Sequence, residues 1–324
     1  TKDYVMGLEV VTPTGEIIKT GGKSVKDVAG YNLKDIFIGS EGTLGIITKV
    51  LLKLIPLPEV TKTILVYFNS LQEAADTVSE IIAAKILPSA LEFLDSTTIK
   101  CVEDFAHLGL NTEIEALLLI EVDGYKEIAE REAQKVFEIC KKNNCAYINI
   151  AKDAAEAVKL RAARKVAFSA LARVKPTTIL EDATVPRSEI TKMITAINDI
   201  AGKYNLLFGI FGHAGDGNLH PTCLTDERNE DEIQRAEKAF EEIFDVAISL
   251  GGTITGEHGV GLSKRKFLQK VVGSEGLDLM MKIKEVFDPN LIMNPGKVMS
   301  LHPQKEKLRV DKERFKRFVL DEWV

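Results

Sequence analysis

Apolar and polar positions in the first part of the chain follow the short-period pattern of β-strands. The runs 4–11 and 16–19 enclose a Pro-Thr-Gly turn, which is typical of a β-hairpin. Residues 45–55 form a further strand-like run that ends at Pro56 and Pro58. Proline cannot donate to a ladder of backbone hydrogen bonds, so we place a domain boundary at residue 56.

Beyond residue 56, strand-like runs alternate with runs whose apolar residues recur every three or four positions. Ser70 and Glu73 form a possible capping box at the start of one such helix. This order predicts an α+β fold in which helices cover an antiparallel sheet on one side. The expected strands are 62–68, 117–122, 177–184 and 206–213, and the further helices are 126–142, 153–172, 188–201 and 229–250.

Composition narrows the class of protein. The 324 residues suggest about two domains, and 45% hydrophobic with 28% charged residues is ordinary for a globular chain. A net charge of −6 and 6% aromatic residues argue against a nucleic-acid partner. No run of 18 apolar residues occurs, so we expect no membrane-spanning helix. Four cysteines without a CxxC pair and no signal peptide favour reduced thiols in a cytoplasmic protein.

Three of the five histidines lie in two glycine-rich segments, 212–220 and 256–261. The first segment reads as a strand followed by a turn, and a hairpin-like reversal would bring His213 and His220 together. Two imidazoles at the end of a sheet form half of a metal site, which Glu257 or His258 could complete. Glycines around these two residues permit the bend that turns both towards one site.

The pattern alone leaves the chemistry of such a site open. A divalent ion lowers the pKa of a bound hydroxyl, and a neighbouring histidine can then take the proton. That hydroxyl can belong to an oxidisable substrate or to a water molecule. An oxidoreductase and a metal-dependent hydrolase therefore both fit these residues.

A second glycine cluster spans residues 38–47, with glycines at 39, 42 and 45. Glycines at this spacing let backbone amides approach a ligand closely. The cluster is neither a GxGxxG motif nor a phosphate-binding P-loop, because no Gly-Lys-Ser/Thr follows. By itself it is a turn with some tendency to bind ligands.

Several of these motifs resemble those of one flavoprotein family. The segments KDVAGYNL (26–33) and GSEGTLG (39–45) resemble the later part of a vanillyl-alcohol-oxidase-type FAD-binding domain. The segments 212–220, 257–261 and DPNLIMNPGKV (288–298) resemble the C-terminal half of FAD-linked D-2-hydroxyacid dehydrogenases. That family includes D-lactate dehydrogenases and a subunit of glycolate oxidase. The resemblance implies flavin-dependent oxidation of a small D-2-hydroxy acid, with D-lactate or glycolate expected, to the 2-oxo acid.

The resemblance also implies roles for individual residues. His213, His220 and Glu257 match ligands of a divalent metal (Zn, Fe or Mn), and His258 matches the base that removes the hydroxyl proton. Arg164 matches an arginine that pairs with the substrate carboxylate, a task that suits a guanidinium fork. Asp182 matches an acidic residue near the site. The residues that match flavin-lining positions are Gly39, Ser40, Glu41, Gly42, Thr43, Gly45, Ile46 and Asn294.

The chain departs from the family in two respects. Arg161 stands where the family often has a tryptophan, three residues before the site arginine. The first part of the family's FAD domain, with its pyrophosphate loop, has no counterpart here, so we expect a fragment or processed piece. The resulting division is 1–56, the end of the FAD domain; 57–290, the substrate or cap domain; 291–300, a return to the flavin; and 301–324, a charged tail.

The electron acceptor expected from the resemblance is a protein, possibly an electron-transferring flavoprotein, or a quinone. The charged tail 301–324 is either a solvated helix or a docking helix for such a partner. Two further alternatives stay open beside the hydrolase. One is a non-catalytic module of a flavoprotein complex, and the other is an oxidase that uses oxygen directly.

Overall fold

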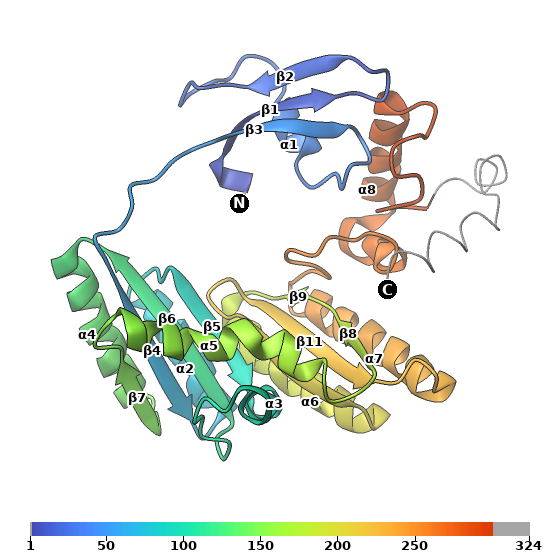
Figure 1. The fold of residues 1–324 in the computed structure, drawn as a ribbon. Helices are drawn as coiled ribbons and strands as arrows, with labels where there is room; N and C mark the ends of the chain where they lie inside the picture. Colours follow the sequence, from blue (N-terminus) through green and yellow to red (C-terminus); the bar gives the residue numbers. More distant parts are fainter. Residues whose placement is uncertain (1, 301–324) are drawn as a thin grey trace. The chain divides into compact units, whose positions relative to one another are not determined.

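The computed structural model describes residues 2–300, so the predicted tail 301–324 lies outside the described residues. The chain forms two compact units (Figure 1). Within the described residues the smaller unit comprises 2–54 and 259–300, and the larger unit comprises 55–258. The division between the units after residue 258 differs from the domain boundary expected at residue 290. Residues 259–290 belong with the smaller unit because they hydrogen-bond to residues 41 and 43.

The smaller unit is built on a three-stranded antiparallel sheet in the order β2-β1-β3. Its first two strands form the predicted hairpin, which is confirmed. Leu8, Val10, Phe37 and Leu44 form its core, against which Phe287 of the last helix packs. The elements are η1 (Lys2–Tyr4), β1 (Val5–Val11), β2 (Ile17–Gly21), α1 (Leu33–Phe37), β3 (Ile46–Leu52) and α8 (Arg265–Phe287), which is kinked at Gly273.

The larger unit contains an antiparallel sheet of eight strands in the order β7-β4-β6-β5-β10-β11-β8, with β9 paired to β11. The strands are β4 (Val60–Phe68), β5 (Ala90–Asp95), β6 (Ala116–Gly124), β7 (Tyr147–Ile150), β8 (Thr177–Leu180), β9 (Ala183–Thr184), β10 (Leu207–His213) and β11 (Asn218–Thr225). The helical segments are α2 (Leu71–Ala83), α3 (Ser96–Ala106), α4 (Lys126–Lys142), α5 (Ala154–Leu171), η2 (Arg187–Glu189), α6 (Ile190–Tyr204) and α7 (Glu230–Ser249).

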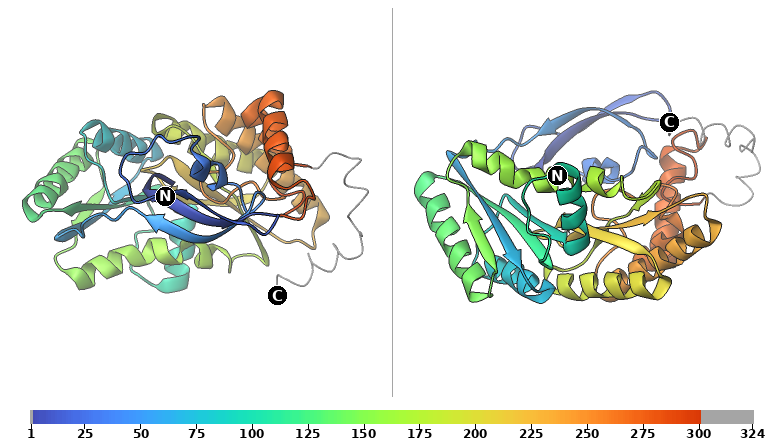
Figure 2. Two further views of the ribbon diagram at one scale, coloured as in Figure 1. Left: turned by 90° about the horizontal axis from the view of Figure 1, so that it is seen from above. Right: turned by 60° about the horizontal axis from the view of Figure 1, so that its bottom comes forward.

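Helices cover both faces of this sheet, which corrects the expectation that they cover one. Successive residues of a strand point to opposite faces, and both Ile64 and Leu65 of β4 are buried. Helices α3 and α5 pack on the face that carries Leu65, while α2, α4, α6 and α7 contact one another in a second layer. The view from above in Figure 2 shows α5 and α2 on opposite sides of the sheet.

Two local details also differ from the sequence-based expectations. Ser70 occupies the N-cap of α2, but its side chain makes no capping hydrogen bond, so the capping box is not formed. Between α2 and β6 the structure adds β5 and α3, which the sequence did not predict. The buried Asp95 joins them, because its carboxylate accepts a hydrogen bond from the backbone of Thr98 and caps α3. None of the helices in the described part of the chain is both long and apolar enough to cross a bilayer.

Candidate active site

The hairpin of β10 and β11 places His213 and His220 on the same face of the large sheet. Phe211 is paired directly with His220, and His213 lies two residues further along the same strand. Side chains two apart in a strand share a face, so the two histidines are diagonal neighbours. Their ring centroids lie 5.4 Å apart. The turn needs Gly217, which has a φ of +74° and whose added Cβ would lie 2.0 Å from the carbonyl oxygen of Val185.

Glu257 reaches the histidines from a loop that one buried carboxylate holds in place. Asp182 Oδ2 accepts backbone hydrogen bonds from Gly256 and Glu257 at 2.7 Å and from His258 at 3.2 Å. Gly256 is required at this point, because a Cβ there would lie 2.3 Å from Thr184 Oγ1. Asp182, for which the family resemblance implies a position near the site, therefore fixes the direction in which the side chains of Glu257 and His258 leave the backbone.

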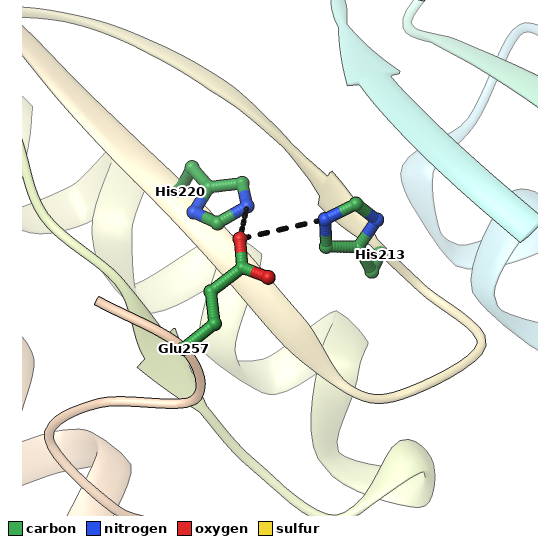
Figure 3. A group of neighbouring side chains, drawn as sticks. All are labelled: His213, His220 and Glu257. Carbon is green, nitrogen blue, oxygen red and sulfur yellow. Dashed lines mark ion pairs between the residues drawn. The ribbon is translucent and has the colours of Figure 1, made fainter. Parts of the chain in front are cut away.

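The three predicted metal ligands converge (Figure 3). Glu257 Oε1 lies 3.5 Å from His213 Nε2 and 3.3 Å from His220 Nε2, and all three ligand atoms lie within 4.8 Å of one another. Ligands of a tetrahedral zinc ion, each 2.0–2.1 Å from the metal, are about 3.3 Å apart. Two imidazole nitrogens and one carboxylate oxygen at this spacing fit a divalent ion with an open position for a substrate.

The protonation behaviour of the two histidines differs because their surroundings differ. Burial, with smaller effects from His258 and His213, lowers the pKa of His220 to about 4, so its imidazole is neutral near pH 7. The hydrogen bond with the Glu92 carboxylate raises the pKa of His213. The Nδ1 atom of His220 is buried without a hydrogen-bond partner among the described residues. Only Nε2 of His220 is therefore placed to interact with Glu257 or a metal ion.

His258 lies beside this cluster. Its ring stacks on that of His220 with centroids 5.1 Å apart and an angle of 10° between the planes. Its Nε2 is 3.8 Å from Glu257 Oε1 and its Nδ1 is 3.8 Å from Asp182 Oδ1, and its side chain is 35% exposed. These separations exceed hydrogen-bond length, so the ring has a nitrogen available for a proton from a molecule bound at the cluster.

Arg164 and the two-histidine cluster are joined by a residue that the sequence did not point to. Glu92 Oε2 accepts a hydrogen bond from Arg164 Nε at 2.7 Å, and Glu92 Oε1 lies 2.8 Å from His213 Nδ1. The guanidinium also lies over the ring of Phe211, 4.9 Å from its centroid. Burial would raise the pKa of Glu92, but His213 and Arg164 outweigh it, and the pKa of this carboxyl is lowered.

Comparison with known proteins assigns the chain to a family. Residues 57–298 match the model of the family described as "FAD linked oxidases, C-terminal domain". The chain belongs to this family. It is 57% identical over 305 residues to glycolate oxidase subunit GlcD of Bacillus subtilis (strain 168), covering 94% of this chain and 65% of that protein. It is 36% identical over 303 residues to glycolate oxidase subunit GlcD of Escherichia coli (strain K12), covering 93% and 60%.

The chain thus spans less than two thirds of the length of these curated relatives. Solved structures share the fold at low identity. The p-cresol methylhydroxylase structure aligns with a TM-score of 0.70 at 18% identity, covering 92% of this chain and 65% of that one. The 4-ethylphenol oxidase of Gulosibacter chungangensis aligns with a TM-score of 0.66 at 16% identity, covering 95% and 67%. The expected fold class, a vanillyl-alcohol-oxidase-type flavoprotein fold with a helix-covered antiparallel sheet, is confirmed.

Membership of the FAD-linked oxidases directs attention to the glycine cluster of the smaller unit. Asn294 Nδ2 donates a 2.7 Å hydrogen bond to the carbonyl oxygen of Glu41, so the structure brings Asn294 to the 39–45 segment. The Glu41 carboxylate accepts hydrogen bonds from the backbone of Val260 at 2.7 Å and Gly261 at 2.8 Å. The carboxylate of Glu41 is thus used in holding the chain's own loops together.

The predicted flavin-lining residues divide into packed and open positions. A Cβ at Gly45 would lie 2.7 Å from Val10, so this glycine is explained by packing. Gly39 has open space around it, and Ile46 is 56% exposed. A bare backbone and an exposed apolar side chain on one short segment fit contact with the edge of a planar, partly apolar cofactor. Flavin contact by Gly39, Ile46 and the exposed Asn294 stays a prediction, with which their exposure is consistent.

A buried lysine ties the two flavin-related motifs to each other. The Nζ atom of Lys284 donates hydrogen bonds to the carbonyl oxygens of Thr43 and Met293, each 2.6 Å away, and it pairs with Asp288. Asp288 in turn accepts backbone hydrogen bonds from Ile292 and Met293. The ammonium group of Lys284 therefore joins the 39–45 segment to the 288–298 segment, in addition to the hydrogen bond from Asn294, and the motifs themselves did not reveal this link.

Arg161, which stands where the family often has tryptophan, has a partner of its own. Its Nη1 atom lies 2.8 Å from Glu121 Oε1, which also accepts a hydrogen bond from Thr63. Helix α5 therefore carries two arginines, and each forms an ion pair with a different glutamate of the sheet. Arg161 is engaged with Glu121, and its charge is balanced there.

Proposed function

We propose that this chain provides the substrate-binding and metal-binding part of an FAD-dependent dehydrogenase that oxidises a D-2-hydroxy acid, D-lactate or glycolate, to the 2-oxo acid. The observation that carries this proposal is the convergence of His213, His220 and Glu257 beside His258. The similarity to glycolate oxidase subunits and to "D-lactate dehydrogenase" of Anaerostipes hadrus, at 34% identity over 313 residues, supports the substrate class.

Arg164 is suited to binding the substrate carboxylate. Its Nε is used by Glu92, and among the described residues no side chain or carbonyl accepts a hydrogen bond from its two terminal nitrogens. Two parallel N–H groups match the two oxygens of a carboxylate, which gives strength and orientation together. Binding at Arg164 would present the hydroxyl on the next carbon of a 2-hydroxy acid to a neighbouring group.

His258 is suited to taking the proton of that hydroxyl. A divalent ion held by His213, His220 and Glu257 would supply positive charge that acidifies the hydroxyl, and FAD would accept the hydride. The imidazole of His258 then accepts the released proton at a ring nitrogen. Asp182 contributes by holding the backbone of residues 256–258 so that Glu257 and His258 face the same space.

The reduced flavin must pass its electrons onward. We propose a protein acceptor, such as an electron-transferring flavoprotein, or a quinone. The family resemblance supports this proposal, as do relatives whose names include an acceptor, such as "D-lactate dehydrogenase [cytochrome], mitochondrial" of Arabidopsis thaliana at 34% identity. Assays with dye acceptors, with and without oxygen, distinguish this dehydrogenase from an oxidase.

The deciding experiment uses the full-length protein as its source produces it. Oxidation of D-lactate and glycolate is measured with a dye acceptor before chelation, after chelation and after return of Zn²⁺, Mn²⁺ or Fe²⁺. We expect chelation to abolish turnover and one ion to restore it. Full activity of a metal-stripped sample would refute the metal role. Absence of released flavin on denaturation, with no turnover, would instead favour a hydrolase or a non-catalytic module.

A further inference from the structure

Glu92 lies in the middle of strand β5 at the point where three functional elements meet. It is the direct cross-strand partner of His213 on β10, and α5 places Arg164 above it. Its side chain is only 13% exposed, in a strand whose other members include the buried Leu91, Phe93 and Leu94. A carboxylate in such a strand is costly to bury unless both of its oxygens have partners.

The two oxygens of Glu92 serve two different neighbours. Oε1 lies 2.8 Å from His213 Nδ1, and Oε2 lies 2.7 Å from Arg164 Nε. A neutral imidazole carries one proton, and a carboxylate at Nδ1 keeps that proton on Nδ1. Nε2 of His213 is then left bare, as a metal ligand must be, and it is the Nε2 atom that faces Glu257.

The second contact fixes the guanidinium. With Nε bound to Glu92 and its plane over Phe211, Arg164 can present only its two terminal nitrogens to another molecule. The same carboxylate thus sets the tautomer of one residue and the orientation of the other. Phe211 is itself the cross-strand partner of His220, so the support reaches the second histidine as well.

We propose that Glu92 is a positioning residue that couples the carboxylate-binding arginine to the metal-binding histidine. The inference rests on the proposed function, because it concerns the same site. It adds that the substrate-binding and metal-binding halves of the site share one buried support. Loss of Glu92 weakens metal binding and substrate binding together, although Glu92 touches neither.

The chain provides a matched control for the electrostatic part of this argument. Glu121 on the adjacent strand β6 accepts a hydrogen bond from Arg161, one turn before Arg164 on α5. Its side chain is 15% exposed, close to the value for Glu92. Glu121→Gln therefore removes a similar charge from a similar carboxylate–arginine pair without a contact to His213, His220 or Glu257.

The informative substitution is Glu92→Gln, because it keeps the shape of the side chain. His213 and Arg164 contact different oxygens of Glu92, and an amide has an oxygen at only one of these two positions, so one of the two neighbours loses its acceptor. The NH₂ group of the amide would face either the Nε–H donor of Arg164 or the Nδ1 atom of His213. At Nδ1 it would favour the tautomer that carries its proton on Nε2. Glu92→Asp keeps two acceptor oxygens on a shorter stem and should restore part of the loss.

The test measures zinc affinity and steady-state kinetics of the full-length protein. Zn²⁺ dissociation constants come from competition with a chromogenic chelator, and KM and kcat come from dye-coupled D-lactate oxidation. We expect Glu92→Gln to weaken zinc binding by roughly 10- to 100-fold and to raise KM, with Glu92→Asp in between. Glu121→Gln should change zinc affinity by less than about twofold, since it leaves the ligands untouched.

Three outcomes decide the matter. Unchanged zinc affinity in a folded Glu92→Gln protein would overturn the inference while leaving the metal site intact. Zinc binding by the unmodified protein no tighter than by a His220→Ala variant would refute the metal site, and with it the proposed function. A measurement that needs no substitution is ¹⁵N NMR of the His213 imidazole, where a proton on Nε2 instead of Nδ1 would also overturn the inference.

Discussion

The buried carboxylate of Asp182 accepts a 2.7 Å hydrogen bond from the backbone N–H of Glu257, across 75 residues of sequence. The same oxygen binds the N–H groups of the residues on either side of Glu257. Three consecutive amides on one oxygen leave the loop little freedom. The position of the acidic residue in the proposed metal site is therefore set by a side chain distant in the sequence.

Substitution Asp182→Asn should cost stability and metal affinity together. An amide carries no charge, and hydrogen bonds to charged groups contribute about 1.5–3 kcal/mol each, so we expect a loss of about 2 kcal/mol or more in the free energy of unfolding. Urea denaturation and zinc competition measure the two effects. Asp216→Asn, in the turn of the hairpin, is the control. Zinc affinity equal to that of the unmodified protein would show that the loop does not depend on Asp182.

Substitution His258→Ala should abolish turnover while leaving flavin and metal bound. A positioned general base contributes typically 10²- to 10⁴-fold to rate, and the proposed ligand atoms belong to other side chains. The measurements are kcat with D-lactate, bound zinc and the flavin absorbance of the full-length protein. Oxidation of D-lactate at a near-normal rate would remove His258 from the role of base.

Substitution Arg164→Lys should raise KM for the hydroxy acid with a smaller effect on kcat. Lysine keeps the charge but cannot form two parallel hydrogen bonds to a carboxylate, nor one more to Glu92 in the same plane. Loss of one charge-assisted hydrogen bond corresponds to roughly a 10- to 100-fold rise in KM. Arg161→Lys is the matched control on the same helix, and an equal rise there would show that the effect is not specific to residue 164.

The stability of the larger unit should depend on pH through Asp95. Burial raises the pKa of this carboxyl from 3.8 to about 6. Between pH 4 and 6 the folded state binds more protons than the unfolded state, so its stability falls as the pH rises through this window. A shift of this size corresponds to a loss of about 3 kcal/mol in the free energy of unfolding, and this loss is complete above pH 6.

Asp95→Asn removes this titration and can still cap α3 through its side-chain oxygen. The difference in free energy of unfolding between the variant and the unmodified protein should therefore grow in favour of the variant from pH 4 to pH 7. Urea denaturation at both pH values measures it. A difference that is the same at both values would contradict the raised pKa.

Those parts of the site that depend on local pattern were predictable from the sequence. The glycine-rich turn between His213 and His220 specifies a hairpin, and side-chain alternation then places both rings on one face. The convergence of Glu257 with them was expected from the family resemblance. It follows physically from Asp182, whose role in the backbone of residues 256–258 no local pattern reveals.

Glu92 was missed because it is not part of a recognisable motif. It lies in the run ALEFLD, which is too short and too apolar to indicate a functional site, and strand β5 itself was not predicted. The signal was an acid in the middle of an apolar run, because a carboxylate buried there needs a partner. Helix α8 was missed for another reason, since Gly273 and Gly276 interrupt the apolar periodicity, and the helix is in fact kinked at Gly273.

The hairpin turn between His213 and His220 has a consequence for how this protein can change. Addition or removal of one residue between positions 214 and 217 would shift the pairing of β11 by one step and send the imidazole of residue 220 to the opposite side of the sheet. Descendants and engineered versions can therefore vary the chemistry of that turn, apart from Gly217, but they must preserve its length.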